Sequence, residues 1–243
     1  MTDTAGALSG APDLIRRQDM GIDLELLQTI GPMLFRGLKV TMEIAVIGIL
    51  LGFILGSLCG YALQGRNKIA KGIANLYVWI MRGTPIVVQA LYVYFVVPEI
   101  IGLIKGERMV LDPTLAGILV ITLNAGAFIS QLVRGALDSV DIGQKEAGAS
   151  LGLSKMQIMI HIIIPPAFRS IIPSLFNQFI ISVKDTALLS MISVNEITRQ
   201  TQNYVMRTYK TIPGYTVCAI FYLVLLSVLM IVQKLVEKKI ASK

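Results

Sequence analysis

The sequence is poor in the side chains that build catalytic and metal centres. It has two cysteines, one histidine and one tryptophan among 243 residues. His161 has no cysteine or histidine neighbour at the spacing of metal ligands, so we expect no metal or cofactor site. Cys59 and Cys218 lie within apolar runs far apart in the sequence, which favours small packing residues over a disulfide. The phosphate-binding motif G-x-x-x-x-G-K-[ST] is absent from the sequence, so we do not expect this chain to bind ATP itself.

Charged residues are also scarce. Only 15% of the residues are charged, 54% are hydrophobic and the mean hydropathy is +0.70, values far from those of an ordinary soluble domain. We therefore expect an integral membrane protein. The net charge is +7, but the basic residues flank hydrophobic segments and do not form one face. Anionic lipid headgroups are the expected counter-charge, and nucleic acid is not an expected partner.

The apolar segments predict an all-α membrane protein with about five transmembrane helices. A helix needs about 20 apolar residues to cross a bilayer core of about 30 Å. The segments that meet this length are 40–63, 73–97, 113–137, 171–192 and 215–236. The second carries the break Arg82-Gly83-Thr84-Pro85 and is expected to end before Pro98. Residues 1–23 lack the apolar core of a signal peptide, and residues 22–34 have the pattern of an interfacial amphipathic helix.

Small and charged residues interrupt these apolar segments. Four glycines recur every four residues in the first segment, which predicts close packing against another helix; a place in a transport path is the alternative. They are Gly48, Gly52, Gly56 and Gly60. Lys184 and Asp185 lie inside the fourth segment, where an ionised group costs about 2.5 to 3.5 kcal/mol on insertion scales. They should face protein or water, either as functional groups or as charges neutralised by structural partners.

A polar stretch over residues 143–152 separates the third and fourth apolar segments and predicts a docking loop with two short helices. Asp141 is expected to cap the first helix and Gly152 to close it. Ser154 and Gln157 have the spacing of a capping box for the second helix. That second helix is expected to end at Pro165-Pro166.

The docking loop carries a family signature. Glu146-Ala147-Gly148, three residues, Gly152, nine residues and Ile162-x-Ile164-Pro165 resemble the "EAA" loop of ABC importer inner-membrane subunits, where this loop contacts the ATPase. Gly148 stands where the family usually has alanine, which loosens the helix by up to about 1 kcal/mol. Further segments resemble the polar amino-acid uptake branch of these permeases: Gly37-Leu38-x-x-Thr41, Arg82-Gly83-Thr84-Pro85, Val88-Gln89, Asn124-Ala125-Gly126-Ala127 and Lys184-Asp185-Thr186-Ala187-Leu188-Leu189-Ser190.

The resemblance implies a type I ABC importer permease in the bacterial inner membrane, with two short cytoplasmic coupling helices. Residues 1–35 would be a tail and interfacial segment, 36–238 the transmembrane permease domain and 239–243 a cytoplasmic tail. The N-terminus would lie outside and the C-terminus in the cytoplasm. The implied partners are membrane lipid, ABC ATPase subunits that hydrolyse ATP, an external amino-acid-binding protein and a permease partner in a homodimer or heterodimer. Coupling to the ATPase is expected at Glu146, Ala147, Gly148 and Gly152.

The scarce polar groups of the spans are the candidates for binding the transported amino acid. They are Arg82, Thr84, Asn124, Gln131, Lys184, Asp185 and Thr186. A zwitterion entering an apolar environment needs a cation for its carboxylate, from Arg82 or Lys184, and an anion for its ammonium, from Asp185. The family often has tyrosine and glutamate where this chain has Phe128 and Gln131. The neutral Gln131 therefore favours a neutral polar or dicarboxylic amino acid over arginine or lysine.

Two other classes of protein are alternatives. An ion channel or secondary transporter would also lack an ATP site and carry intramembrane charges, but the docking loop is unexpected there. Secondary transporters usually contain paired broken helices, and only one broken span is recognisable in this sequence. A membrane enzyme is a weaker alternative, because no histidine, serine or metal constellation accompanies Asp185.

Overall fold

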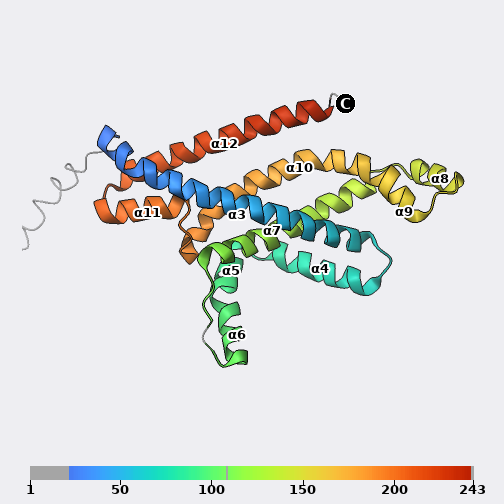
Figure 1. The fold of residues 1–243 in the computed structure, drawn as a ribbon, viewed down its shortest axis with the longest axis horizontal. Helices are drawn as coiled ribbons and strands as arrows, with labels where there is room; N and C mark the ends of the chain where they lie inside the picture. The colour runs from blue at the N-terminus through green and yellow to red at the C-terminus, as the bar shows by residue number, and fades with distance from the viewer. Residues whose placement is uncertain (1–21, 108, 242–243) are drawn as a thin grey trace, which may run out of the picture.

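The computed structural model describes residues 22–107 and 109–241, and the regular secondary-structure elements of this part are all helices, joined by short loops (Figure 1). The expected all-α fold is confirmed. Five helical segments are long and apolar enough to cross a membrane: Leu24–Gln64, Ile86–Lys105, Pro113–Asp138, Lys155–Ile192 and Thr211–Ile240. The expected tail over residues 1–21 lies outside the described residues. The segment predicted as interfacial continues without interruption into the first span, as one helix, α3 (Leu24–Gln64).

The packing of α3 against α7 (Pro113–Asp138) forms the centre of the molecule. The glycines of α3 predicted to pack closely lie on this contact. A Cβ atom at Gly56 would lie 2.7 Å from the carbonyl oxygen of Gly126, and one at Gly60 would lie 2.8 Å from that of Ser130. The glycines therefore allow the two backbones to approach, and the packing interpretation is confirmed.

A second close contact joins α3 to α11 (Ile197–Thr208). A Cβ atom at Gly37 would lie 2.7 Å from the backbone of Ile197, which explains a glycine at this position. Glu196 caps α11 and is fully buried. Its carboxylate accepts hydrogen bonds from the backbone N–H of Arg199 at 2.6 Å and of Thr198 at 2.7 Å. The Tyr222 hydroxyl of α12 (Thr211–Ala241) also donates to it, at 3.0 Å, so this carboxylate ties α11 to α12.

The predicted second span, 73–97, is wrong in its bounds. One helix, α4 (Lys68–Gly83), ends before Pro85, and a new helical segment begins at Ile86. It comprises α5 (Ile86–Leu91), η1 (Tyr92–Val96) and α6 (Val97–Lys105). Thr84 is extended because the ring of Pro85 disfavours a helical residue before it. Pro98 does not end the span, because it lies in the first turn of α6 after the wide π turn of η1, where a missing N–H is tolerated.

The prediction that the second docking helix ends at Pro165-Pro166 is also wrong. From α9 (Lys155–Gln157) the chain continues through η2 (Ile158–Ile163) into α10 (Ile164–Asp185) and η3 (Thr186–Ile192). The two prolines follow the π turn of η2 and lie in the first turn of α10, so their rings do not interrupt the helix. The fourth span therefore begins within the docking loop and not at residue 171.

The arrangement of the helices separates two ends of the molecule (Figure 1). The first residues of α3 lie beside α11 at one end. The docking helices, α8 (Ile142–Ser150) and α9, lie at the other end, and α12 runs back toward that end. The α5–α6 segment turns away from the direction shared by these long helices.

Candidate functional site

Two adjoining cavities between α4, α7 and α10 contain most of the predicted substrate-binding residues. Arg82, Thr84, Asn124 and Asp185 line the first, of about 240 Å³, which we call the Asp185 cavity. Arg82 and Gln131 line the second, of about 530 Å³, which we call the Gln131 cavity and which extends to α12. Five residues singled out in the sequence thus lie on the walls of one continuous region.

A buried hydrogen-bond network shapes the wall formed by the break after α4. The side-chain amide of Gln89 donates to the carbonyl oxygen of Met81 at 2.8 Å and to Thr84 at 3.0 Å. Because Pro85 has no N–H, the Met81 carbonyl lacks its helical partner, and Gln89 replaces that partner. Asn124 of α7 donates to the Gln89 side-chain oxygen at 3.0 Å. This use of its amide leaves the Asn124 carbonyl oxygen available in the Asp185 cavity.

The lining of the Asp185 cavity includes two side chains of opposite charge, Arg82 and Asp185. The guanidinium of Arg82 lies over the ring of Phe128, 5.3 Å from its centroid. The ring face attracts a cation and so positions the otherwise exposed Arg82 side chain. Asp185 is half-buried at the end of α10. The cavity therefore offers a cation and a carboxylate between spanning helices, which suits a ligand that carries both charges.

Two of the predicted substrate-binding residues lie outside both cavities. Lys184 is exposed, and its side chain does not line either cavity. The hydroxyl of Thr186 is buried and donates to the carbonyl oxygen of Val183 at 2.8 Å. Adjacent residues of a helix point about 100° apart, which explains why Asp185 faces the cavity and Lys184 does not.

Two further polar residues of this region were not predicted to bind substrate. Gln89 appeared only as part of a family signature, and its role in closing the helix break requires the tertiary structure. Gln178 of α10 is 6% exposed and lines both cavities. Gln178 lies seven residues before Asp185, so both residues share one face of the helix. This periodicity is the feature of the sequence from which Gln178 could have been predicted to line the site.

The docking loop has the local geometry that its sequence predicts. Asp141 caps α8, and Gly152 follows this helix with φ of 79°, in the left-handed region. The capping box is present, with the Ser154 N–H donating to Gln157 Oε1 at 2.8 Å. These contacts fix a short helix, a tight turn and the start of the next helix.

One face of α8 packs against η2, and the other face is exposed. Gly148 is the buried residue of α8, and a Cβ atom there would lie 2.6 Å from the Cδ1 atom of Ile162. Glu146 and Ala147 are exposed. Large apolar side chains around the loop are exposed as well: Ile142, Leu151 and Met156. The loop therefore presents a mixed polar and apolar surface of the kind that binds another protein.

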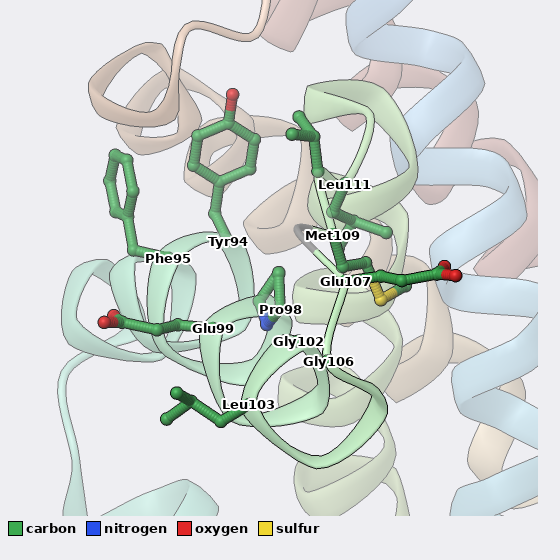
Figure 2. Close-up of a pocket in the computed structure, with 11 residues that line it drawn as sticks. Tyr94, Phe95, Pro98, Glu99, Gly102, Leu103, Gly106, Glu107, Met109 and Leu111 are labelled. Carbon is green, nitrogen blue, oxygen red and sulfur yellow. The ribbon is translucent and has the colours of Figure 1, made fainter.

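A larger cavity, of about 800 Å³, lies beside α6 and the segment that follows it. Its polar groups do not converge. Figure 2 shows Glu99 and Glu107 pointing to opposite sides, with Tyr94 directed away from both. The described residues also contain no group of three or more His, Cys, Asp or Glu side chains placed to hold a metal ion. The candidate site is therefore the pair of cavities together with the docking loop.

Comparison with known proteins gives consistent matches. Residues 48–242 match the family described as "Binding-protein-dependent transport system inner membrane component". The glutamine transport system permease protein GlnP of Escherichia coli (strain K12) is 36% identical over 208 residues, covering 86% of this chain and 93% of the relative. The arginine transport system permease protein ArtQ of Bacillus subtilis (strain 168) is 29% identical over 211 residues, covering 87% and 94%.

Solved structures share the fold. A crystal structure of an amino acid ABC transporter with histidines has a TM-score of 0.80 and 28% identity, covering 90% of this chain and 99% of the other. An inward-facing structure of the MetNI methionine ABC transporter has a TM-score of 0.68 at 20% identity, covering 86% and 96%, and supports the fold alone.

Proposed function

Because the chain belongs to the family of binding-protein-dependent transport system inner membrane components, we propose that it is the transmembrane subunit of an ATP-driven importer of polar amino acids. The observation that carries the proposal is the Asp185 cavity, which places Arg82 and Asp185 on the walls of an otherwise apolar spanning region. The relatives named for glutamine and arginine transport support the substrate class.

The amino acid binds through its two charged groups. Asp185 pairs with the ammonium and Arg82 with the carboxylate, since leaving either charge unpaired away from water costs several kcal/mol. Arg82 is preferred to Lys184 for this role because it lines the cavity. Thr84, Asn124 and Gln131 remain available to the substrate side chain. The neutral Gln131 favours a neutral or dicarboxylic side chain over a cationic one.

The energy comes from ATPase subunits that bind the docking loop. The exposed Glu146 and Ala147, with the apolar side chains beside them, form the surface for this partner. Gly148 and Gly152 set the packing and the turn of the loop. The loop and the C-terminus then face the cytoplasm and the start of α3 faces outside, where an external amino-acid-binding protein delivers the substrate.

Transport follows from a shift between two packing arrangements of the spanning helices. The permease pairs with a similar subunit, identical or not, and ATP-driven closure of the ATPases moves the two docking loops together. The spans tilt and open the substrate path outward, and hydrolysis returns them. The docking loop transmits this motion well because its second helix is continuous with the fourth span, from Lys155 to Ile192.

The decisive experiment is uptake into vesicles that contain this permease with its ATPase and binding protein. We expect uptake of radiolabelled glutamine only when ATP is supplied on the ATPase side, and loss of uptake in Asp185→Asn. Gln131→Glu should shift preference toward arginine. Uptake that needs no ATP and follows an ion gradient would instead identify a channel or secondary transporter.

The orientation is tested separately with single cysteines in a background that lacks Cys59 and Cys218. An impermeant thiol reagent added to intact cells should label a cysteine at Glu107 but not one at Lys155. Labelling of position 155 alone would reverse the proposed orientation.

A further inference from the structure

The two cavities meet at a small set of shared residues. Arg82, Phe128, Gln178 and Ile181 line both the Asp185 cavity and the Gln131 cavity. Arg82 is held over the ring of Phe128, and Gln178 and Ile181 lie one turn apart on α10. A molecule that moves from one cavity to the other therefore passes these four side chains.

Gln178 differs from the other buried amides of this region. Gln89 and Asn124 bond to one another, and Gln89 also bonds to the helix break. Gln178 is as buried as they are, at 6% exposed, and within the part of the chain that the structure describes its amide makes no hydrogen bond to the protein. Its side-chain N and O atoms are nevertheless not fully enclosed, so they remain accessible from the two cavities that Gln178 lines. An amide that reaches a cavity without a protein partner keeps its two donors and its acceptor available to a ligand in that cavity.

We propose that Gln178 binds the side chain of the transported amino acid and selects for neutral side chains that both donate and accept hydrogen bonds. This inference rests on the proposed function. Asp185 lies seven residues further along the same helix face, about 10 Å away along the axis at 1.5 Å per residue. Arg82 and Asp185 then bind the charged groups of the substrate, and Gln178 meets the far end of a side chain the size of glutamine.

The chemistry of the amide sets the specificity. A glutamine side chain carries two N–H donors and one carbonyl acceptor and has no charge. It complements a carboxamide in both directions, whereas an apolar side chain would leave it unpaired. A site built to hydrogen-bond its ligand discriminates strongly against analogues that lack the bonding group.

The test is a direct binding measurement on the nanodisc-embedded permease and ATPase complex without the binding protein, so that selection by the delivery protein does not contribute. The ligands are radiolabelled glutamine and norleucine, which is similar in length but lacks the carboxamide. We expect Gln178→Leu to lower glutamine affinity about tenfold and to leave norleucine affinity within about twofold. Gln178→Glu should raise affinity for arginine relative to glutamine.

Gln64→Leu is the matched control, because it makes the same substitution at a glutamine that lines neither cavity. It should leave the ratio of glutamine to norleucine affinity unchanged. Equal losses for both ligands in Gln178→Leu, or no loss, would overturn the assignment of Gln178 while leaving the importer itself intact. If the unmodified complex bound no amino acid and ATP-driven uptake was also absent, both proposals would fail.

Discussion

The hydrogen-bond network at the helix break makes a strong prediction about Gln89. In Gln89→Leu the side chain keeps a similar size but loses its amide. The Met81 carbonyl then has no partner, because Pro85 provides no N–H, and the Asn124 amide loses its acceptor. The Thr84 hydroxyl also loses a contact, but Thr84 is exposed and can bond to water.

The expected magnitude follows from counting the groups left unpaired. Two of them, the Met81 carbonyl and the Asn124 amide, are partly or fully buried, and each costs about 1–3 kcal/mol when unsatisfied. The substitution should therefore lower the free energy of unfolding by about 2–6 kcal/mol. For a protein of this size that corresponds to a fall in Tm of about 4 °C or more.

The assay is thermal unfolding of the detergent-solubilised permease, in which the fraction of protein that remains monodisperse is measured as the temperature rises. Gln64→Leu is the control, because Gln64 donates one exposed hydrogen bond, to Asp138 at 2.6 Å, whose loss should change stability by less than about 1 kcal/mol. A Gln89→Leu variant as stable as Gln64→Leu would refute the reasoning, since it would mean that water replaces Gln89 at the break.

Three other predictions concern packing, pH and coupling. Gly56→Ala should destabilise the protein by about 1–3 kcal/mol in the same thermal assay, because its Cβ meets backbone, whereas Gly72→Ala, with nothing within 4 Å, should be neutral or stabilising. Burial raises the pKa of Glu196 from 4.5 to about 7, so the folded state holds its proton to higher pH and stability should fall by about 3 kcal/mol as the pH rises from below 4.5 to above 7. Unfolding measured across this range should lose that slope in Glu196→Gln, and an unchanged slope would assign the effect to other groups. Glu146→Lys and Gly152→Asp should each abolish ATP-driven uptake without preventing membrane insertion. In Gly152→Asp the reason is that a φ of 79° strains any residue with a Cβ atom. Normal uptake in either variant would mean that the loop is ordinary connective structure.

The sequence by itself determined the features that depend on neighbours along the chain. Apolar runs of sufficient length indicate spanning helices wherever they occur, and the caps at Asp141 and Ser154 formed as predicted. A cap joins residues only two or three positions apart, so the local pattern is enough. The spacing of the glycines also predicted a packed face of α3, although it did not identify α7 as the partner.

The tertiary structure decided everything that depends on residues far apart in sequence. It paired Gln89 with Asn124, placed Gln178 where the two cavities meet, turned Lys184 away from the cavity and buried Glu196 among backbone donors. It also carried the helices past Pro98 and Pro165, because π turns make room for a proline that sequence rules treat as a stop. Helical periodicity determines which residues share a face, but the partner of that face is set by long-range packing, and the polar groups of this permease acquire their roles only through those contacts.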